Sequence, residues 1–319
     1  MAVLIGDVTP KDEFMHPVSS DPHFSENMLF TFFARDGSHG GLIRIGNRVN
    51  EGHAEVTFLL FLPDGRTLFQ FRRASITDNK GFDAAGVRFA VIEPTEQIHT
   101  SYVGPAIAMT DASALLDPGK AFKSSPLVDV KFDVLQQAVS ALYLPMPFHY
   151  EQHMHAIGTL EVDGVPMAID AFGVRDHTWG RRNWQATLCD RTLWCTLTDN
   201  GGFALSVTWH DETNAPEVMG SFVTQDEKID VVEATVESTY LEDGVTHSAF
   251  TTHLRLANNE NVDVAGKVLH LAPLRHRGPE NTTYIGQGMS AFESGDSAAF
   301  GLSEYMDLLV NGRRALTVG

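Results

Sequence analysis

The chain has 319 residues and a mass of 35.0 kDa, and 23 Lys and Arg against 41 Asp and Glu give a formal net charge of −18. This balance excludes a domain that binds nucleic acid through clustered cations, and an anionic membrane surface would repel the chain. The composition, 43% apolar and 20% charged, is typical of a globular protein, and this length favours two domains.

Short apolar runs such as Val56–Leu62 fall well below the roughly 18 residues of a membrane-spanning helix. The N-terminal sequence lacks a basic segment followed by an apolar stretch, so we expect a cytoplasmic protein. The two cysteines, Cys189 and Cys195, predict neither a disulfide framework nor a four-ligand zinc site made by cysteines alone. We therefore expect no bound metal.

Along the chain, apolar runs with a two-residue alternation are separated by turn signals, which indicates an antiparallel all-β protein. The pairs Asp64-Gly65, Asp163-Gly164 and Asp243-Gly244 predict tight hairpin turns. The clearest alternation lies in 127–134, where apolar residues at every second position predict one buried face. In chain order, further strands are predicted at Ala54–Leu62, Gly86–Glu93, Gln97–Val103, Leu127–Val134, Trp184–Leu188, Thr192–Thr198, Phe203–Trp209, Val218–Val223, Gly266–Leu271, Thr283–Phe292 and Phe300–Leu309.

Helix signals are weak. Asp111 resembles an N-cap before a short helix that Pro118 ends, and Leu135–Leu142 is a second short candidate. Without alternating strands and helices, and without a glycine-rich phosphate loop, the pattern predicts two consecutive antiparallel β-barrels and no nucleotide cofactor. The proline-rich segment Leu142–Phe148 suggests a boundary that divides the chain into domains 1–143 and 144–319.

The densest group of chemically unusual residues is Asp170–Trp184, which follows an apolar strand. In Arg175–His177, a carboxylate can hold an imidazole in one tautomer, or a guanidinium can keep a carboxylate ionised. Trp179 and Trp184 supply apolar surface that raises a carboxyl pKa or stacks on a planar ligand. A structural interpretation stands beside this one: a buried ion pair that closes a barrel end, with Trp179 as its plug.

A second group lies in Phe148–His155, where strand alternation puts Glu151, His153 and His155 on one face and Tyr150 on the other. Two histidines and a carboxylate on one face suit a transition metal or acid/base chemistry. A solvated polar strand face is the commoner arrangement for such a pattern.

Two further segments complete the candidates. Glu304 lies inside the apolar strand Phe300–Leu309, where a carboxylate is costly unless it is paired. It is therefore either a partner for an arginine or a catalytic acid with a raised pKa. Arg275–Arg277, just before a Gly-Pro pair, is interpreted as a solvated loop.

A strand, an Asp-Gly turn, a second strand and the run Arg175-Asp176-His177-Thr178-Trp179-Gly180 occur in that order, followed by Arg182. Together with the N-terminal SENMLFTFFARDG, which contains Glu26, this pattern resembles the tandem lipocalin-like superfamily of AttH-like proteins and carotenoid 1,2-hydratases (hydroxyneurosporene synthases). The resemblance implies two packed lipocalin-like β-barrels of about eight strands each. It also implies acid/base work by the Asp and His of the motif on a hydrophobic substrate.

Our leading hypothesis from the sequence is a cofactor-independent lyase, of hydro-lyase or related C–C or C–O cleaving type, acting on an aromatic or terpenoid molecule. Asp176 is the expected general acid/base with His177 as its partner. The remaining expected catalytic and substrate-binding residues are Glu151, Tyr150, Glu304, Arg175, Arg182, Trp179, Trp184 and His153.

Two other hypotheses stay open at this point. A non-catalytic carrier would hold a hydrophobic ligand inside a barrel, with few carboxylates facing the cavity. A motif that only locks a domain interface would have buried, mutually satisfied side chains and no cavity beside them. A small hydrophobic molecule is the expected partner, nucleic acid and membrane are not, and a homodimer is left open.

Overall fold

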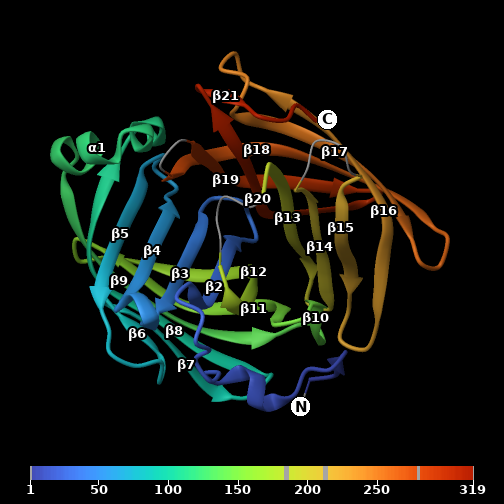
Figure 1. The fold of residues 1–319 in the computed structure, drawn as a ribbon, viewed down its shortest axis with the longest axis horizontal. Coiled ribbons are helices and arrows are strands. Elements are labelled where there is room, and N and C mark those ends of the chain that lie inside the picture. The colour runs from blue at the N-terminus through green and yellow to red at the C-terminus, as the bar shows by residue number, and fades with distance from the viewer. Residues whose placement is uncertain (1, 183–186, 211–214, 279–280, 319) are drawn as a thin grey trace.

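The computed structural model describes residues 2–182, 187–210, 215–278 and 281–318 and consists almost entirely of antiparallel strands (Figure 1). The first sheet contains β1 (Leu4–Ile5), β2 (Phe24–Ala34), β3 (Gly40–Arg48), β4 (His53–Phe61), β5 (Thr67–Ser75), β6 (Phe82–Ala84), β7 (Val87–Glu93), β8 (Gln97–Met109), β9 (Leu127–Ala138), β10 (Leu142–Met146), β11 (His149–Val162) and β12 (Val165–Arg181). The second contains β13 (Cys189–Thr198), β14 (Gly201–Trp209), β15 (Glu217–Val223), β16 (Lys228–Tyr240), β17 (His247–Leu256), β18 (Asn261–Arg277), β19 (Thr282–Ser294), β20 (Ser297–Val310) and β21 (Arg313–Arg314). The helical segments are η1 (Pro10–Glu13), η2 (Val49–Glu51), η3 (Ala112–Leu116) and α1 (Pro118–Ser124).

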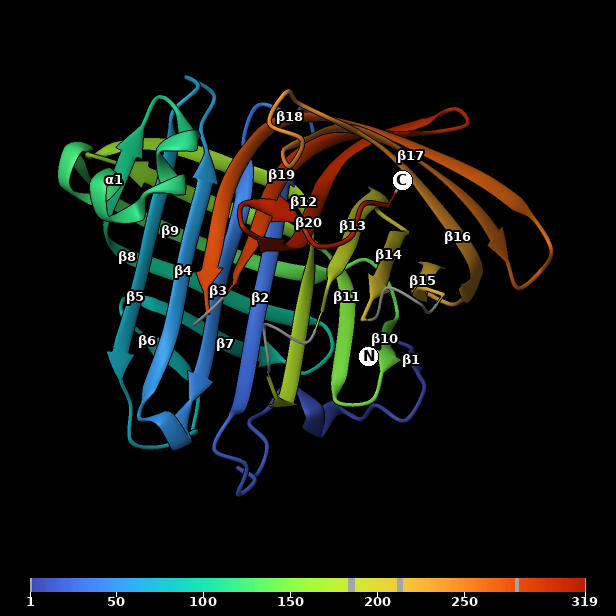
Figure 2. The same cartoon turned by 45° about the horizontal axis from the view of Figure 1, so that its top comes forward.

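Each sheet closes on itself. In the first, hydrogen bonds link β11, β12, β2, β3, β4, β5, β8 and β9 in a ring, because β9 pairs with both β8 and β11. In the second, β13 pairs with β20 and closes the ring that runs from β13 to β20. The two rings lie side by side (Figure 2), and the predicted pair of consecutive antiparallel barrels is confirmed.

The chain passes from the first sheet to the second between Arg181 and Cys189. Residues 149–181 follow the expected boundary at 143/144, yet β11 pairs with β9 and β12 pairs with β2. The Arg-Asp-His motif is therefore part of the first barrel. Most of the proline-rich segment forms β10, which lies between β1 and β11 in the same sheet.

Local sequence rules account for most of the strands. Asp163 and Gly164 both have positive φ angles, 49° and 80°, which is the backbone that a two-residue hairpin between β11 and β12 requires. In β9, Val130 and Phe132 are buried while Lys131 between them is exposed, as the alternation predicts. The predicted N-cap is also present, since the Asp111 side chain accepts a hydrogen bond from the Ser113 N–H.

The predicted helix at Leu135–Leu142 is wrong. Its first half continues β9, and Leu142 begins β10. The cause is long-range pairing, because Leu135 lies opposite both His99 of β8 and Ile157 of β11, and these ladders outweigh a weak local helix preference. The predicted strand Trp184–Leu188 falls mostly outside the described residues.

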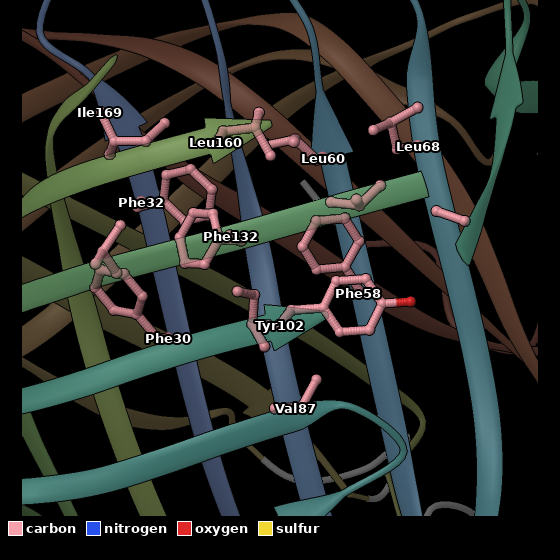
Figure 3. Packing of buried hydrophobic residues seen from close by; sticks show 14 of the residues in the cluster. Phe30, Phe32, Phe58, Leu60, Leu68, Val87, Tyr102, Phe132, Leu160 and Ile169 are labelled. Atoms are coloured by element: carbon pink, nitrogen blue, oxygen red, sulfur yellow. The ribbon is translucent and has the colours of Figure 1, made fainter. Parts of the chain in front are cut away.

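Side chains fill both barrels. In the first, Phe30, Phe32, Phe58 and Phe132 pack together with Tyr102 (Figure 3), and all five are almost fully buried. The second barrel has its own apolar cluster, which contains Phe203, Phe250 and Phe292. Each interior is thus a packed core.

A third apolar cluster joins the two barrels. Outward-facing residues of the first barrel, such as Leu42 and Phe69, belong to one buried cluster with Trp194, Met289 and Leu302 of the second. The two barrels therefore share a packed interface, and the space between them is defined by side chains from both. No helix in the described part of the chain is long and apolar enough to cross a membrane.

Close approach of β12 to β2 yields a stability prediction. A Cβ added to Gly173 would overlap the carbonyl oxygen of Thr31, so Gly173→Ala must shift the backbone. We expect it to lower the free energy of unfolding by about 1–3 kcal/mol, measured by denaturant unfolding. Gly81→Ala is the control, because a Cβ there meets nothing within 4 Å. Equal stability of the two variants would contradict this packing.

Candidate active site

A cavity of about 820 Å³ lies between the two barrels. Its walls come from the outward faces of β2, β3, β11 and β12 on one side and from β13, β14, β15, β19 and β20 on the other. Its titratable lining residues are Arg44, Tyr143, His149, Glu151, Asp176, Arg181, Arg182, Asp190, His210, Glu217 and Glu304. Apolar surface is added by residues that include Met146, Phe148, Trp179, Trp194, Leu205 and Met219.

The two-residue repeat of β12 separates the residues of the Arg-Asp-His motif. Asp176 and Thr178 line the cavity, whereas Arg175 and His177 point to the other side of the sheet, into the end of the first barrel. The predicted partnership between Asp176 and His177 is therefore wrong, because neighbouring residues on a strand face opposite ways.

His149 is the imidazole that contacts Asp176. Its Nε2 forms ion pairs with Asp176 Oδ2 and, at 3.3 Å, with Glu151 Oε1. Asp176 and Glu151 lie directly opposite each other on β12 and β11, which brings their carboxylates to the same ring. Burial alone would lower the pKa of His149, but the negative charges of Asp176 and Glu151 raise it to about 10. His149 is thus a half-buried imidazolium at neutral pH.

Tyr143 extends this group from β10. Its hydroxyl donates a hydrogen bond of 2.6 Å to Glu151 Oε2. Burial, together with the negative charge of Glu151, raises the pKa of Tyr143 well above its ordinary value. The phenol therefore stays protonated and serves as a hydrogen-bond donor in the cavity wall.

Glu304 faces the same cavity from β20 of the second barrel. Burial and the negative charge of Asp190 raise its pKa to about 7, against the hydrogen bond from Gln287 and the positive charge of Arg182. Asp190 itself is buried and accepts hydrogen bonds from the hydroxyls of Thr192 and Ser206, each at 2.7 Å, and from Thr208. The raised pKa of Glu304 follows from a carboxyl group in a half-apolar site beside an ionised neighbour.

Three arginines, Arg44, Arg181 and Arg182, bring positive charge to the cavity. Arg44 on β3 donates to Asn27 Oδ1 at 2.5 Å, and its Nη1 lies 3.9 Å from Glu55. Burial and the nearby charge of Arg182 lower its pKa to about 10, against the favourable charge of Glu55. Because the pKa stays well above 7, Arg44 remains a cation in this wall.

On the other face of β12, Arg175 is fully buried. Its Nη1 donates to Glu13 Oε2 at 2.7 Å and to the Tyr150 hydroxyl at 3.4 Å, and its Nε donates to Gln152 Oε1 at 3.0 Å. Arg175 and Tyr150 therefore do not line the cavity, and their predicted roles in substrate binding and catalysis are not supported by this position. They tie η1 to the end of the first barrel.

His177 belongs to a second buried cluster on that face. Its Nε2 lies 2.9 Å from Glu26 Oε1, and His16 Nδ1 lies 2.8 Å from the same oxygen. Burial opposes ionisation of Glu26, but hydrogen bonds from His16, His177 and Asn79 hold its pKa at about 2. The His16 ring also stacks on Trp179, with centroids 3.7 Å apart. This cluster fastens the N-terminal segment over the end of the barrel.

The predicted His pair on β11 is split between two environments. His153 is buried at the junction of the barrels, where its Nδ1 lies 2.9 Å from the Thr196 hydroxyl, and burial lowers its pKa to about 3. His155 is half-buried and contacts Asp170 at 2.7 Å. Neither residue lines the cavity, so the predicted role of His153 in substrate binding lacks support.

The cavity thus brings together five of the predicted residues: Asp176, Glu151, Glu304, Arg182 and Trp179. Trp184 lies outside the described residues. His149, Tyr143, Asp190 and Arg44 also line the cavity and were not predicted from the sequence. Only His149 carried a detectable signal, since it lies in the polar group 148–155 and alternation puts it on the face of Glu151.

Among the described residues, two groups have the ligand types and spacing to hold a divalent metal. They are His16, Glu26 and His177 at the barrel end, and His149, Glu151 and Asp176 in the cavity. In both groups a metal would replace the ion pairs and hydrogen bonds described above.

A model of the family described as "Domain of unknown function (DUF7064)" matches residues 9–309. No curated protein matches the sequence. Solved structures match over nearly the whole chain. An AttH-type protein from Nitrosomonas europaea has a TM-score of 0.60 at 10% identity, covering 96% of this chain and 98% of its own.

Kievitone hydratase from Nectria haematococca has a TM-score of 0.55 at 10% identity, covering 97% of this chain and 96% of its own. CghA has a TM-score of 0.54 at 12% identity, covering 98% of both chains. These similarities confirm the fold expected from the resemblance to the tandem lipocalin-like superfamily.

Two of the three histidines of β11, His149 and His153, should titrate far apart. We expect His149 to stay protonated and His153 to stay neutral throughout the range from about pH 5 to pH 8. Because the folded-state pKa of His149 lies above 6.5, its ion pairs stabilise the fold below that pH, and this contribution is lost as the pH rises towards 10. Ring nitrogen shifts in NMR measure both states, and a neutral His149 at pH 7 would refute the arrangement.

Proposed function

We propose that this chain, which belongs to the DUF7064 family, is a cofactor-independent hydro-lyase that acts on a hydrophobic aromatic or terpenoid molecule in the cavity between the barrels. The observation that carries the proposal is the meeting of Asp176, Glu151 and Glu304, from three strands, in one partly apolar cavity. Water addition and elimination need an acid, a base and orientation, and these groups supply all three.

Glu304 is the proposed general acid. With its pKa near 7, it holds a proton at neutral pH and can also release it. For hydration of a C=C bond, the Glu304 carboxyl gives its proton to one carbon, and that carbon forms the new C–H bond. The second carbon then takes the oxygen of a water molecule. Elimination of water runs the same steps in reverse.

Asp176 is the proposed general base. Its carboxylate accepts the proton that the attacking water loses, which leaves a neutral alcohol as the product. The imidazolium of His149 holds Asp176 in position and, with Glu151 on its other side, keeps its orientation fixed. Proton exchange with solvent returns Asp176 and Glu304 to their starting states.

We assign the orientation of the substrate to the arginine and tryptophan side chains in the walls of the same cavity. Arg44 and Arg182 suit a carbonyl or phenolic oxygen that gains negative charge during the reaction. Trp179 and Trp194 provide flat apolar surface for a ring or an isoprenoid unit. One structural neighbour is by name a hydratase, of kievitone, and this supports water addition as the reaction type.

The alternative from the sequence, a carrier with its ligand inside a barrel, has less support. Phe58 and Phe132 occupy the first barrel and Phe250 and Phe292 the second, as parts of packed cores. The cavity described above lies instead between the barrels and is lined by several carboxyl groups, which suit proton transfer better than passive storage.

Asp176→Asn tests the base. Pooled aromatic and terpenoid alkenes and alcohols are incubated with the enzyme in isotopically labelled water, and mass spectrometry detects gain or loss of water. We expect the variant to be slower by about 10²–10⁴-fold, because the amide cannot take a proton. It still folds, with a lowered melting temperature, because His149 loses one of its two ion-pair partners. Asp170→Asn, an exposed change on the same strand, is the matched control. Full activity in Asp176→Asn would refute the assignment.

Glu304→Gln tests the acid. If protonated Glu304 delivers the proton, hydration by the native protein slows as the pH rises through about 7. The Gln variant loses most activity and this pH dependence, while Glu293→Gln, an exposed change on β19, keeps both. An unaltered pH profile in Glu304→Gln would assign the proton to another group.

A further inference from the structure

A second cavity, of about 580 Å³, lies beside the proposed reaction site. Its floor is the outward face of β3, β4 and β5, and its other walls come from β18 and β19 of the second barrel. The segment from η3 to α1 lies at its far end, next to β5 (Figure 1).

The two cavities share part of their walls. Leu29, Arg44 and Glu304 line both, so the second cavity adjoins the first beside the proposed catalytic acid. Volumes of about 820 and 580 Å³ each fall within the roughly 300–1,000 Å³ of ordinary small-molecule sites. Because the two cavities adjoin at Glu304, one elongated molecule that passes this side chain would occupy both.

The far part of the second cavity is apolar. Leu42 and Phe69 face it from β3 and β5, and both lie opposite the buried Leu59 of the strand between them. Leu274 of β18 and the exposed Phe122 of α1 line the same space. Such a wall favours hydrocarbon over polar groups.

Charged residues stand along one edge of this cavity. Arg73 and Glu55 lie opposite each other on β5 and β4 and form an ion pair of 3.0 Å. Arg275–Arg277, interpreted from the sequence as a solvated loop, is instead the end of β18 and also lines this cavity. Asp117, the N-cap residue of α1, also lines the cavity, so a charged group borders the apolar wall on that side as well. The cavity is an apolar recess with a polar border.

We propose that the substrate is an elongated, largely apolar molecule whose reacting end binds in the first cavity and whose apolar remainder binds in the second. The inference rests on the proposed function for the position of the reacting end. It narrows the substrate class to compounds with a hydrocarbon extension, such as an alkyl or prenyl chain, attached to the part that gains or loses water. Leu42, Phe69, Phe122 and Leu274 are then specificity residues.

Binding of para-alkylphenols, from methyl to octyl, tests the recess by isothermal titration calorimetry. The phenol group is expected to bind beside the arginines of the first cavity, and the length of the alkyl chain tests whether the second cavity binds hydrocarbon. In the native protein we expect affinity to rise about fourfold for each methylene that enters the recess. Leu274→Trp fills part of the recess, so it should bind para-methylphenol normally and lose this gain for the longer chains.

Leu269→Trp is the matched control, because it is the same substitution on the same strand at an exposed position outside both linings. It should keep the gain per methylene. If Leu274→Trp does not fold, Ile285→Trp on β19 places the same bulk in the same recess. No gain with chain length in the native protein, or the same gain in a folded recess variant, would overturn the proposal.

The titration is repeated with Asp176→Asn to distinguish failure of the proposed lyase activity from failure of the proposed recess. One outcome is that the gain in affinity per methylene persists in this variant while the native protein neither adds water to any compound nor removes it. This outcome would support the proposed recess and refute the proposed lyase activity. Turnover that depends on Asp176 and is fastest for compounds without an extension would keep the lyase and overturn the recess.

Discussion

The alternation of side chains along β12 is the constraint on which the rest of the structure depends. Arg175 and His177 turn inward and are held by Glu13 and Glu26, both of them fully or almost fully buried. Asp176, between them, turns outward to the cavity. Because unpaired buried charges are costly, the inward pairs hold the backbone of β12 in place. The carboxylate of Asp176 is attached to the same backbone, so its position is fixed as well. Alternate residues of one motif on β12 thus stabilise the end of the first barrel and line the proposed reaction site.

The site belongs to neither barrel alone. Asp176 and Glu151 come from the first barrel, and Glu304 and Asp190 come from the second. The charge of Asp190 contributes to the raised pKa of Glu304, while Arg182 opposes it from the segment that follows β12. The pKa of the proposed acid therefore depends on both barrels, because Asp190 raises it from the second barrel while Asp176 raises it and Arg182 lowers it from the side of the first. Filled interiors leave the interface as the place where a ligand can meet these groups.

Local rules were sufficient for most of the strands, the hairpin turns and the all-β class, because alternation and Asp-Gly turns depend on neighbouring residues only. The same rules identified Glu304, since an acid inside an apolar strand is unusual wherever it occurs. Asp190 and Arg44 could not be found in this way, because they reach the cavity through pairings between distant strands. The boundary at 143/144 did not anticipate that β11 and β12 join the first sheet, for the same reason. The pairing of Asp176 with His177 overlooked that neighbouring residues of β12 face opposite ways, and the imidazole that meets Asp176 comes from β11.

Closure of the first barrel by its last two strands has a consequence for the order of folding. β12 pairs with β2 across more than half of the first barrel's sequence, and β11 pairs with β9. Until residues 149–181 have left the ribosome, β2 and β9 keep unpaired edges, which are prone to pair with other chains. Such long-range closure is slow, since loop entropy must be overcome before the contacts form. The strands that complete the barrel are also those that carry Asp176, His149 and Glu151, so a nascent chain has no site until its first barrel is whole.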